Sequence, residues 1–238
     1  IPRPTGQMEQ VTRFVMDFGK RLSLEVIQDK AGNVVIKKPA TKGYENGKTI
    51  ILQSHLDMVP QKNSGVEHDF TRDPIDAYVD GDWVRARSTT LGADNGIGCA
   101  MMMAVLEDDT LQHPPIEALF TVDEEVGMDG ANGLEKGLVD GSLMINLDTE
   151  EEGELCIGCA GGRDVNVLFR FQPDREIDEE DVAYKISLKG LKGGHSGVQI
   201  HLGRANANKL MNRFLKDVVS NYEARVASIQ GGSLRNAI

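Results

Sequence analysis

The sequence predicts an α/β fold whose sheet is largely parallel, followed by a smaller α+β region. Two apolar runs, Lys48–His55 and Ile116–Val122, are typical of strands that are buried on both faces. A helical pattern from about Asn95 to Glu107 lies between them, and strands that alternate with helices are typical of a parallel sheet. From about Gly162 apolar and polar residues alternate one by one, which is the pattern of antiparallel strands.

Local signals predict the remaining elements of the first part. Apolar residues at helical spacing predict a helix over Gln7–Leu22. Two strand-like segments on either side of a short turn predict a hairpin over Leu24–Lys38. The polar stretch Gln61–Asp80 is predicted to be a long loop, and Leu143–Asp148 is predicted to be a short strand.

The second part is predicted to be a small sheet with one amphipathic helix. Strands are predicted over 163–172, 183–190 and Glu223–Ile229, and the helix over about Gly203–Val218. The buried face of that helix is expected to carry Ala207, Leu210, Met211, Phe214 and Leu215. A chain of 238 residues is long enough for two domains, which we place at 1–161 and 162–238.

Composition and charge narrow the range of partners. The formal net charge is −11 and the Lys and Arg residues are scattered, which argues against nucleic acid or an anionic membrane surface as a partner. The longest apolar run, around Ala100–Leu106, is far shorter than the ~20 residues that a membrane-spanning helix needs. The three cysteines do not make a disulfide framework, so a reducing, cytoplasmic location is expected.

Successive core elements of the first part end in residues that can bind a metal ion. They are His55 and Asp57 at the first strand, Asp94 before the helix, Asp123, Glu124 and Glu125 after the second strand, and Asp148 after the third. Because strand ends of an α/β sheet converge at one edge, these side chains are expected to form one site. An imidazole with several carboxylates suits zinc, with manganese or cobalt as substitutes.

These residues also have ordinary structural interpretations. His55 can be a partly buried histidine with satisfied nitrogens, Asp94 can cap the helix, and Asp148 can cap a strand end. The number of polar endings favours a metal site, since each buried charge costs desolvation free energy unless a cation offsets it. Asp57 lies on the same side of the strand as His55 and can therefore fix the orientation of the imidazole.

Glu124 and Glu125, the double glutamate, would point to opposite faces of a regular strand. Both can serve one site only if the backbone leaves strand geometry there. A turn or an unusual peptide bond is therefore predicted at this point, near Asp123.

Six segments, in this order, resemble the M20 metallopeptidase family: SHLDMVP, TLGADNGIG, TVDEEVGMDG, INLDTEEEGE, CAGG and LKGGHSG. Within that family the chain is most similar to the bacterial cytosolic aminoacyl-histidine dipeptidases, over nearly its whole length. The resemblance implies that residues 1–161 are the first part of a zinc-peptidase catalytic domain. Residues 162–238 would begin a lid domain through which the protein forms a homodimer, and the substrates would be Xaa-His and related dipeptides.

The resemblance also implies two zinc ions with four ligands: His55 and Asp148 on the first ion, Glu125 on the second, and Asp94 between them. Asp57 would orient His55, and Glu124 would be the general base that takes a proton from a metal-bridging water.

In the predicted lid, the resemblance implies that His195 stabilises the oxyanion of the tetrahedral intermediate. Asn236 is expected to contact the substrate.

The chain departs from the family pattern in one respect. Family members carry a further metal-ligating histidine after the lid, and none of the five histidines here lies in a matching context. We therefore expect a fragment of a longer enzyme, with little peptidase activity by itself. The alternatives are another M20 activity (tripeptidase or N-acyl-amino-acid deacylase), a non-catalytic metal-binding protein, or redox chemistry at Cys156 and Cys159, which we otherwise expect to be half-buried and unreactive.

Overall fold

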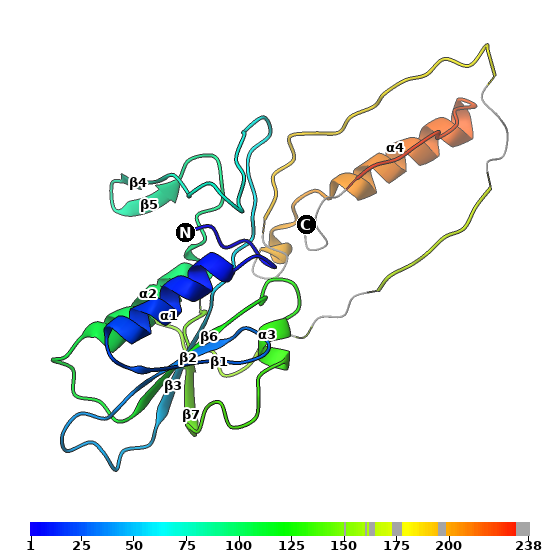
Figure 1. The fold of residues 1–238 in the computed structure, drawn as a ribbon. Helices are drawn as coiled ribbons and strands as arrows, with labels where there is room; N and C mark the ends of the chain where they lie inside the picture. The colour runs from blue at the N-terminus through cyan, green and yellow to red at the C-terminus, as the bar shows by residue number, and fades with distance from the viewer. Residues whose placement is uncertain (150, 160, 162–164, 173–177, 195–198, 232–238) are drawn as a thin grey trace. The chain divides into compact units, whose positions relative to one another are not determined.

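The computed structural model describes residues 1–149, 151–159, 161, 165–172, 178–194 and 199–231 (Figure 1). The chain divides into two compact units, Ile1–Gly162 and Arg163–Ile238. The first unit carries a five-stranded sheet, and the described part of the second includes a helix of 15 residues. The roles of catalytic domain and lid stay predictions.

A five-stranded sheet forms the centre of the first unit. Its strands lie in the order β1 (Glu25–Gln28), β2 (Val34–Lys38), β6 (Ile116–Thr121), β3 (Ile50–His55) and β7 (Leu143–Asn146). β6, β3 and β7 pair in parallel, whereas β1 and β2 form an antiparallel hairpin and β2 pairs antiparallel with β6. Within this sheet β2 alone runs against the other strands, so the predicted α/β fold with a largely parallel sheet is confirmed.

Two helices, α1 (Glu9–Arg21) and α2 (Ala93–Glu107), cover one face of this sheet (Figure 1). The buried apolar side chains of α1, Val11, Val15 and Phe18, lie three or four residues apart, which places them on one face of the helix. The core between helices and sheet consists of Val11, Val15, Phe18, Cys99, Met102, Leu106, Val34, Ile36, Ala118 and Phe120, together with Met8, Leu56 and Val122. The contributing residues of β2 and of β6 lie two apart, as the alternation of side chains along a strand requires.

The opposite face of the sheet has a smaller apolar cluster, which consists of Val35, Ile51, Leu119 and Leu138. Leu138 comes from the chain between α3 (Asp129–Asn132) and β7. β7 lies at the edge of the sheet, and the side chains of Leu143, Met144 and Ile145 are exposed.

The polar stretch Gln61–Asp80 is predicted to be a loop, but its last four residues form the first strand of a two-stranded hairpin. β4 (Ala77–Asp80) pairs antiparallel with β5 (Trp83–Ala86). The expectation is therefore wrong from Ala77 onward. The turn between the two strands contains Gly81 with a φ of 61°, a conformation that glycine adopts without steric cost.

The second unit contains a short 3₁₀ turn (η1, Ile200–Leu202) and the helix α4 (Ala207–Asn221). The predicted helix is confirmed, but it begins at Ala207 rather than at about Gly203. Asn206 explains the start, because its side chain accepts a hydrogen bond from Lys209 N at 3.0 Å and so caps the first turn.

The buried face predicted for α4 is wrong, since no residue of the helix is buried. Phe214, for example, is 44% exposed. The apolar face of α4 nevertheless points toward another segment of the second unit. Leu210, Met211 and Phe214 line a cavity of about 220 Å³ together with Ile186, Ser187 and Leu188. A helix packed on one extended segment buries less surface than a helix packed on a sheet.

The three strands predicted for the second unit are not strands in the structure. The described residues 165–172, 183–190 and Glu223–Ile229 have no ladder partner in the described part of the chain. A strand requires a neighbour that supplies its hydrogen-bond partners, and alternation of apolar and polar residues does not show that such a neighbour exists. Residues 163 and 164 lie outside the described residues.

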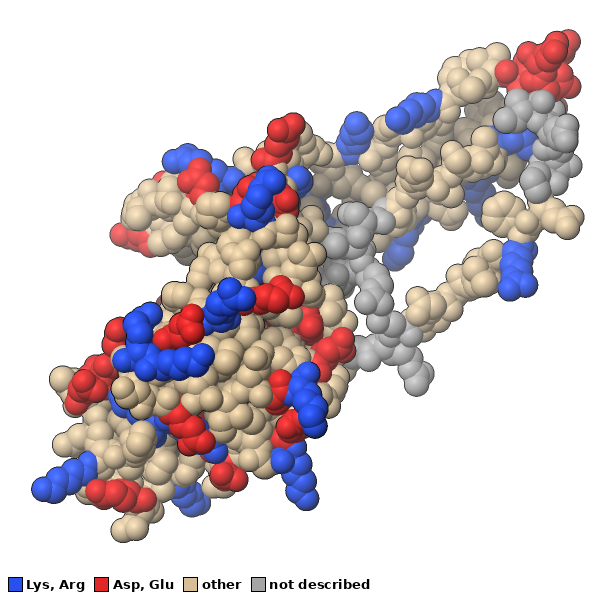
Figure 2. Space-filling view, viewed as in Figure 1, with Lys and Arg blue, Asp and Glu red and all other residues tan. Residues whose placement is uncertain are grey.

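Charged residues of both signs are interspersed over the face of the first unit that Figure 2 shows. Among the described residues, no helix is long and apolar enough to cross a membrane.

Candidate metal centre

The carboxyl ends of β3, β6 and β7 meet at one edge of the sheet. β3 and β6 pair in parallel, with His55 opposite Thr121. On the other side of β3, Leu147 N donates a hydrogen bond to Gln53 O at 2.9 Å, so the chain stays beside β3 as it continues to Asp148. The residues that follow the three strands are therefore brought together, as parallel strands predict.

The imidazole of His55 lies at the centre of this group, and its side chain is only 1% exposed. Nε2 lies 3.0 Å from Asp94 Oδ1, 3.7 Å from Asp148 Oδ1 and 3.9 Å from Glu124 Oε2. A ring nitrogen carries at most one hydrogen, so it cannot serve three carboxylates. The interpretation of His55 as a buried histidine with satisfied nitrogens therefore leaves the convergence of carboxylates unexplained.

Asp57 lies on the other side of the imidazole, as the sequence predicted. His55 Nδ1 is 3.1 Å from the carbonyl oxygen of Asp57 and 3.4 Å from Oδ1 of its carboxylate. The same carboxylate accepts hydrogen bonds from Glu124 N at 3.1 Å, from Glu125 N at 3.3 Å and from Thr5 Oγ1 at 2.9 Å. Asp57 thus links the orientation of the imidazole to the position of the double glutamate, a link that the sequence did not reveal.

The chain leaves strand geometry at the double glutamate, as predicted. Asp123 has a φ of 53°, and Glu124 O accepts hydrogen bonds from Gly127 N and Met128 N, which form a turn. Both glutamates therefore lie after the end of β6, where side chains no longer have to alternate between the two faces of the sheet. The unusual peptide bond lies elsewhere in the site, since the bond between Asp94 and Asn95 is cis.

The surrounding carboxylates hold the imidazole in its charged form. Burial lowers the pKa of His55, but hydrogen bonding to Asp57 and Asp94 and the negative charge of Asp148 outweigh burial and raise this pKa to about 11.

The carboxylates in turn crowd one another. Burial and the charge of Asp94 raise the pKa of Glu125 to about 7, although His55 opposes the shift. Burial also raises the pKa values of Glu124 and Asp148. Carboxyl groups that favour protonation indicate an excess of negative charge, which a divalent cation would offset.

The donor atoms fit a metal ion. One atom each from His55, Asp94 and Glu125 lie within 4.8 Å of one another. Asp148 lies beside the same imidazole nitrogen. Imidazole nitrogen and carboxylate oxygen are ligands that zinc takes in catalytic sites. The structure thus gathers the four predicted ligands in one place, while the identity and number of the ions stay predictions.

A buried asparagine that the sequence did not single out holds the loop of the double glutamate. Asn33 is 0% exposed, and its Nδ2 donates hydrogen bonds to Asp29 Oδ2 and Gly130 O, both at 2.8 Å. Its Oδ1 accepts a hydrogen bond from Val122 N at 3.2 Å. Val122 and Gly130 are the two ends of the loop, and Gly130 N also donates to Val122 O at 3.0 Å. One side chain therefore fixes both ends of the loop.

Replacing Asn33 with alanine should destabilise the intact protein. The change leaves partners of the amide buried without hydrogen bonds, at roughly 1–3 kcal/mol for each, so we expect the free energy of unfolding to fall by at least about 2 kcal/mol. Denaturant unfolding measures this loss. The control is Gln28→Ala in the same hairpin, because Gln28 is exposed and its amide makes only a 3.5 Å contact with Gly32 O. Equal stability of the two variants would contradict the assigned role of Asn33.

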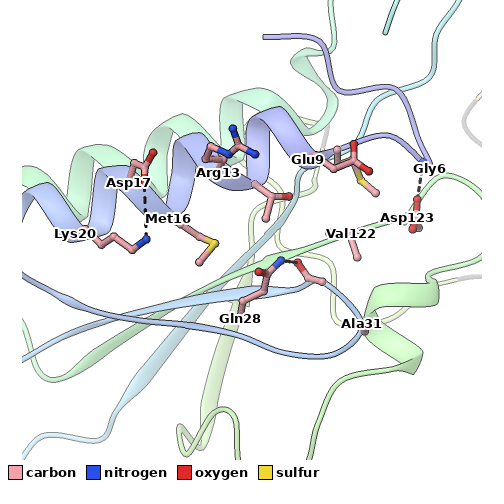
Figure 3. A pocket seen from close by; sticks show the side chains of 13 residues that line it. Gly6, Glu9, Arg13, Met16, Asp17, Lys20, Gln28, Ala31, Val122 and Asp123 are labelled. Atoms are coloured by element: carbon pink, nitrogen blue, oxygen red, sulfur yellow. Dashed lines mark hydrogen bonds and ion pairs between the residues drawn. The ribbon is translucent and has the colours of Figure 1, made fainter.

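A cavity of about 690 Å³ lies beside the same loop but not at the candidate metal centre (Figure 3). It is lined by one face of α1, by the turn between β1 and β2, and by Val122 and Asp123. Gly6 N donates a hydrogen bond to Asp123 Oδ1 there, at 2.8 Å. None of the predicted metal ligands lines this cavity, so we assign it no part in the chemistry of the site.

Two predicted site residues, His195 and Asn236, lie outside the described residues. Cys156 and Cys159 are exposed, so the expectation that they are half-buried is wrong. The reason is that no described element of the first unit covers residues 151–159, which are all exposed.

Comparison with known proteins gives consistent matches. Residues 51–229 match peptidase family M20/M25/M40. The chain is 50% identical, over 243 aligned residues, to the cytosol non-specific dipeptidase of Escherichia coli (strain K12), with 100% of this chain and 49% of that protein covered. The crystal structure of aminoacylhistidine dipeptidase from Vibrio alginolyticus is similar, with 46% identity and a TM-score of 0.67, and covers 100% of this chain and 48% of that one.

A tripeptidase from Staphylococcus aureus is a more distant match, with 25% identity, a TM-score of 0.53, and coverage of 63% of this chain and 40% of that one. The chain spans about half the length of the two dipeptidases that it matches. The family match extends over most of the chain, and it includes the elements that carry the candidate metal centre from β3 onward. The chain therefore belongs to peptidase family M20/M25/M40.

Proposed function

We propose that the intact protein is a metal-dependent dipeptidase that hydrolyses Xaa-His and related dipeptides with two zinc ions. The observation that carries this proposal is the position of His55 among carboxylates, with donor atoms of His55, Asp94 and Glu125 within 4.8 Å of one another. The names of two similar proteins, a cytosol non-specific dipeptidase and an aminoacylhistidine dipeptidase, support the substrate class.

The proposed ligands are His55 and Asp148 for the first ion, Glu125 for the second, and Asp94 between them. Manganese or cobalt would serve as substitutes for zinc. When bound, the two ions would lower the pKa of a water molecule and polarise the scissile carbonyl.

Glu124 is the proposed general base. Its side chain is 36% exposed, so it borders both the protein and the space in which a substrate would lie. Burial raises the pKa of its carboxyl group, which brings its proton affinity closer to that needed at neutral pH. It would accept a proton from the attacking water and pass it to the leaving amine. Asp57 would keep the His55 imidazole in place through Nδ1.

The same proposal assigns oxyanion stabilisation to His195 and a substrate contact to Asn236. It also includes a homodimer formed through the second unit and a location in the cytosol. These parts rest on the resemblance to the family, and the name of the Escherichia coli relative supports the location.

The intact protein, offered three classes of substrate, tests this function. We expect kcat/KM for a Xaa-His dipeptide to exceed that for a tripeptide and an N-acetyl amino acid by more than about tenfold. Chelation should abolish turnover, and added zinc should restore it. Faster hydrolysis of either competing substrate would replace the dipeptidase assignment with that activity. Metal binding without turnover of any substrate would indicate a non-catalytic metal-binding protein.

A further inference from the structure

The guanidinium of Arg3 connects two segments of the candidate metal centre that are far apart in the sequence. Nη1 donates hydrogen bonds to Leu56 O at 2.8 Å and to Asp57 O at 3.1 Å, and Nη2 donates to Gly92 O. Leu56 and Asp57 directly follow β3, whereas Gly92 directly precedes α2. One planar side chain therefore sets the distance between the carboxyl end of β3 and the amino end of α2.

The chain next to Arg3 is attached to the same region. Thr5 Oγ1 donates a hydrogen bond to Asp57 Oδ2 at 2.9 Å, and Gly6 N donates to Asp123 Oδ1 at 2.8 Å. The segment from Arg3 to Gly6 thus contacts the residues that follow both β3 and β6. These bonds fix the backbone from which the guanidinium extends.

Two glycines leave the space that the guanidinium occupies. A Cβ atom at Gly92 or at Gly96 would lie only 2.6 Å from Arg3 Nη2, which is closer than atoms pack. Gly92 also has a φ of 75°, a conformation that favours glycine. The glycines on either side of Asp94 therefore leave the room that the arginine side chain needs at this place.

Arg3 places a positive charge near the carboxylates of the site without taking up their oxygen atoms. Burial lowers the pKa of the guanidinium, and the negative charges of Asp57, Asp94 and Glu125 oppose this shift. Its hydrogen bonds go to backbone carbonyl oxygens, so it does not use up the carboxylate oxygens of Asp94 and Glu125. An arginine is protonated at every physiological pH, and it therefore supplies a fixed positive charge beside the ligands.

We propose that Arg3 is a positioning residue of the metal centre, which holds His55 at the distance from Asp94 that a metal ion bound to both requires. The inference deepens the proposed function and rests on it for the presence of the metal ion. A lysine could keep the charge, but its single ammonium lacks the planar fork that reaches carbonyl oxygens on two segments.

Binding of Co²⁺ to the intact protein tests the inference, because both affinity and the visible absorption of bound Co²⁺ report on ligand geometry. Arg3→Met keeps a long side chain and removes all donors, and Arg3→Lys keeps the charge. Arg13→Met makes the same change at an exposed arginine of α1 and is the control. We expect Co²⁺ affinity to fall about 10–100-fold in Arg3→Met, with an altered absorption spectrum, and to fall less in Arg3→Lys. Arg13→Met should bind as the unaltered protein does.

Unchanged Co²⁺ affinity and absorption in Arg3→Met would overturn the inference, even if the variant unfolds at a lower temperature. If Arg3→Met does not fold, Arg3→Lys decides: weaker binding with a changed spectrum supports the role, and binding equal to that of the control contradicts it. The metal measurements need no substrate, so failure to hydrolyse dipeptides would contradict the proposed function without affecting this comparison. A protein that binds no Co²⁺ would overturn both.

Discussion

Replacing Glu124 with glutamine should lower kcat for dipeptide hydrolysis by about 10²–10⁴-fold while the protein keeps its metal. The amide has nearly the shape of the carboxylate but cannot accept a proton. Glu124 Oε2 lies 3.9 Å from His55 Nε2, yet the group whose donors all lie within 4.8 Å of one another contains Glu125 and not Glu124. Glu124 thus lies beside the proposed metal centre without belonging to that group of three residues.

The hydrogen bonds around Asp57 explain why this change should act on the chemistry alone. Asp57 accepts hydrogen bonds from the backbone N–H groups of both Glu124 and Glu125, and these bonds do not depend on the side chain at position 124. Glu125 should therefore keep its place in the variant. The loss would appear in kcat, with KM and metal content little changed.

Metal content by elemental analysis and steady-state kinetics on the intact protein measure this result. The control is Glu107→Gln, the same chemical change at an exposed glutamate at the far end of α2 from Asp94. Turnover in Glu124→Gln equal to that of the control would remove Glu124 from the role of general base. Loss of metal together with turnover would instead make Glu124 a ligand.

The gathering of the ligands could be predicted from the sequence because it follows from local signals. A strand that ends in His55 and a strand that ends before the double glutamate are each visible in the sequence. Parallel pairing then places their carboxyl ends together. The departure from strand geometry at Asp123 was predictable for a similar reason, since two adjacent side chains cannot otherwise face one site.

The hydrogen bonds of Arg3 and Asn33 that hold the site in place could not be predicted, because they join residues that are far apart in the sequence. Arg3 contacts Gly92, and Asn33 contacts Val122 and Gly130, and no periodicity relates such positions. Asn33 lay at the start of the second strand-like segment of the predicted hairpin, and Arg3 lay outside every predicted element. Each reveals its role only through a specific hydrogen bond in the folded chain.

In the second unit, the periodic spacing of apolar residues predicted a helix but did not predict strand pairing. The spacing of Leu210, Met211 and Phe214 predicted a helix, and α4 is present, because a helix makes its hydrogen bonds within one segment. The strands predicted at 165–172 and 183–190 need partners from elsewhere in the chain. In the described part of this unit no segment supplies them. Local patterns therefore predicted the helix correctly and the strands wrongly.

Replacing Glu125 with glutamine should weaken metal binding by at least about 100-fold, because it removes a carboxylate of the donor group itself. Thermal or denaturant unfolding at a fixed zinc concentration measures the effect through linkage. If that concentration is 100 times the dissociation constant of the unaltered protein, zinc stabilises that protein by about 2.7 kcal/mol and the variant by only about 0.4 kcal/mol. Asp129→Asn, at an exposed residue of the same loop, is the control and should keep the full stabilisation.

The pH dependence of metal binding distinguishes loss of this ligand from general damage. Without metal the pKa of Glu125 is raised to about 7, by burial and by the charge of Asp94, and the pKa of His55 is about 11. A metal ion binds the deprotonated forms, so falling pH weakens binding. His55 must lose a proton at every pH below about 11, whereas Glu125 must lose one only below about 7. Affinity in the unaltered protein should therefore fall more steeply below about pH 7 than above it, and Glu125→Gln should lack this additional steepness. The same change of slope in the variant would assign it to a group other than Glu125, such as Asp148, whose pKa is also raised.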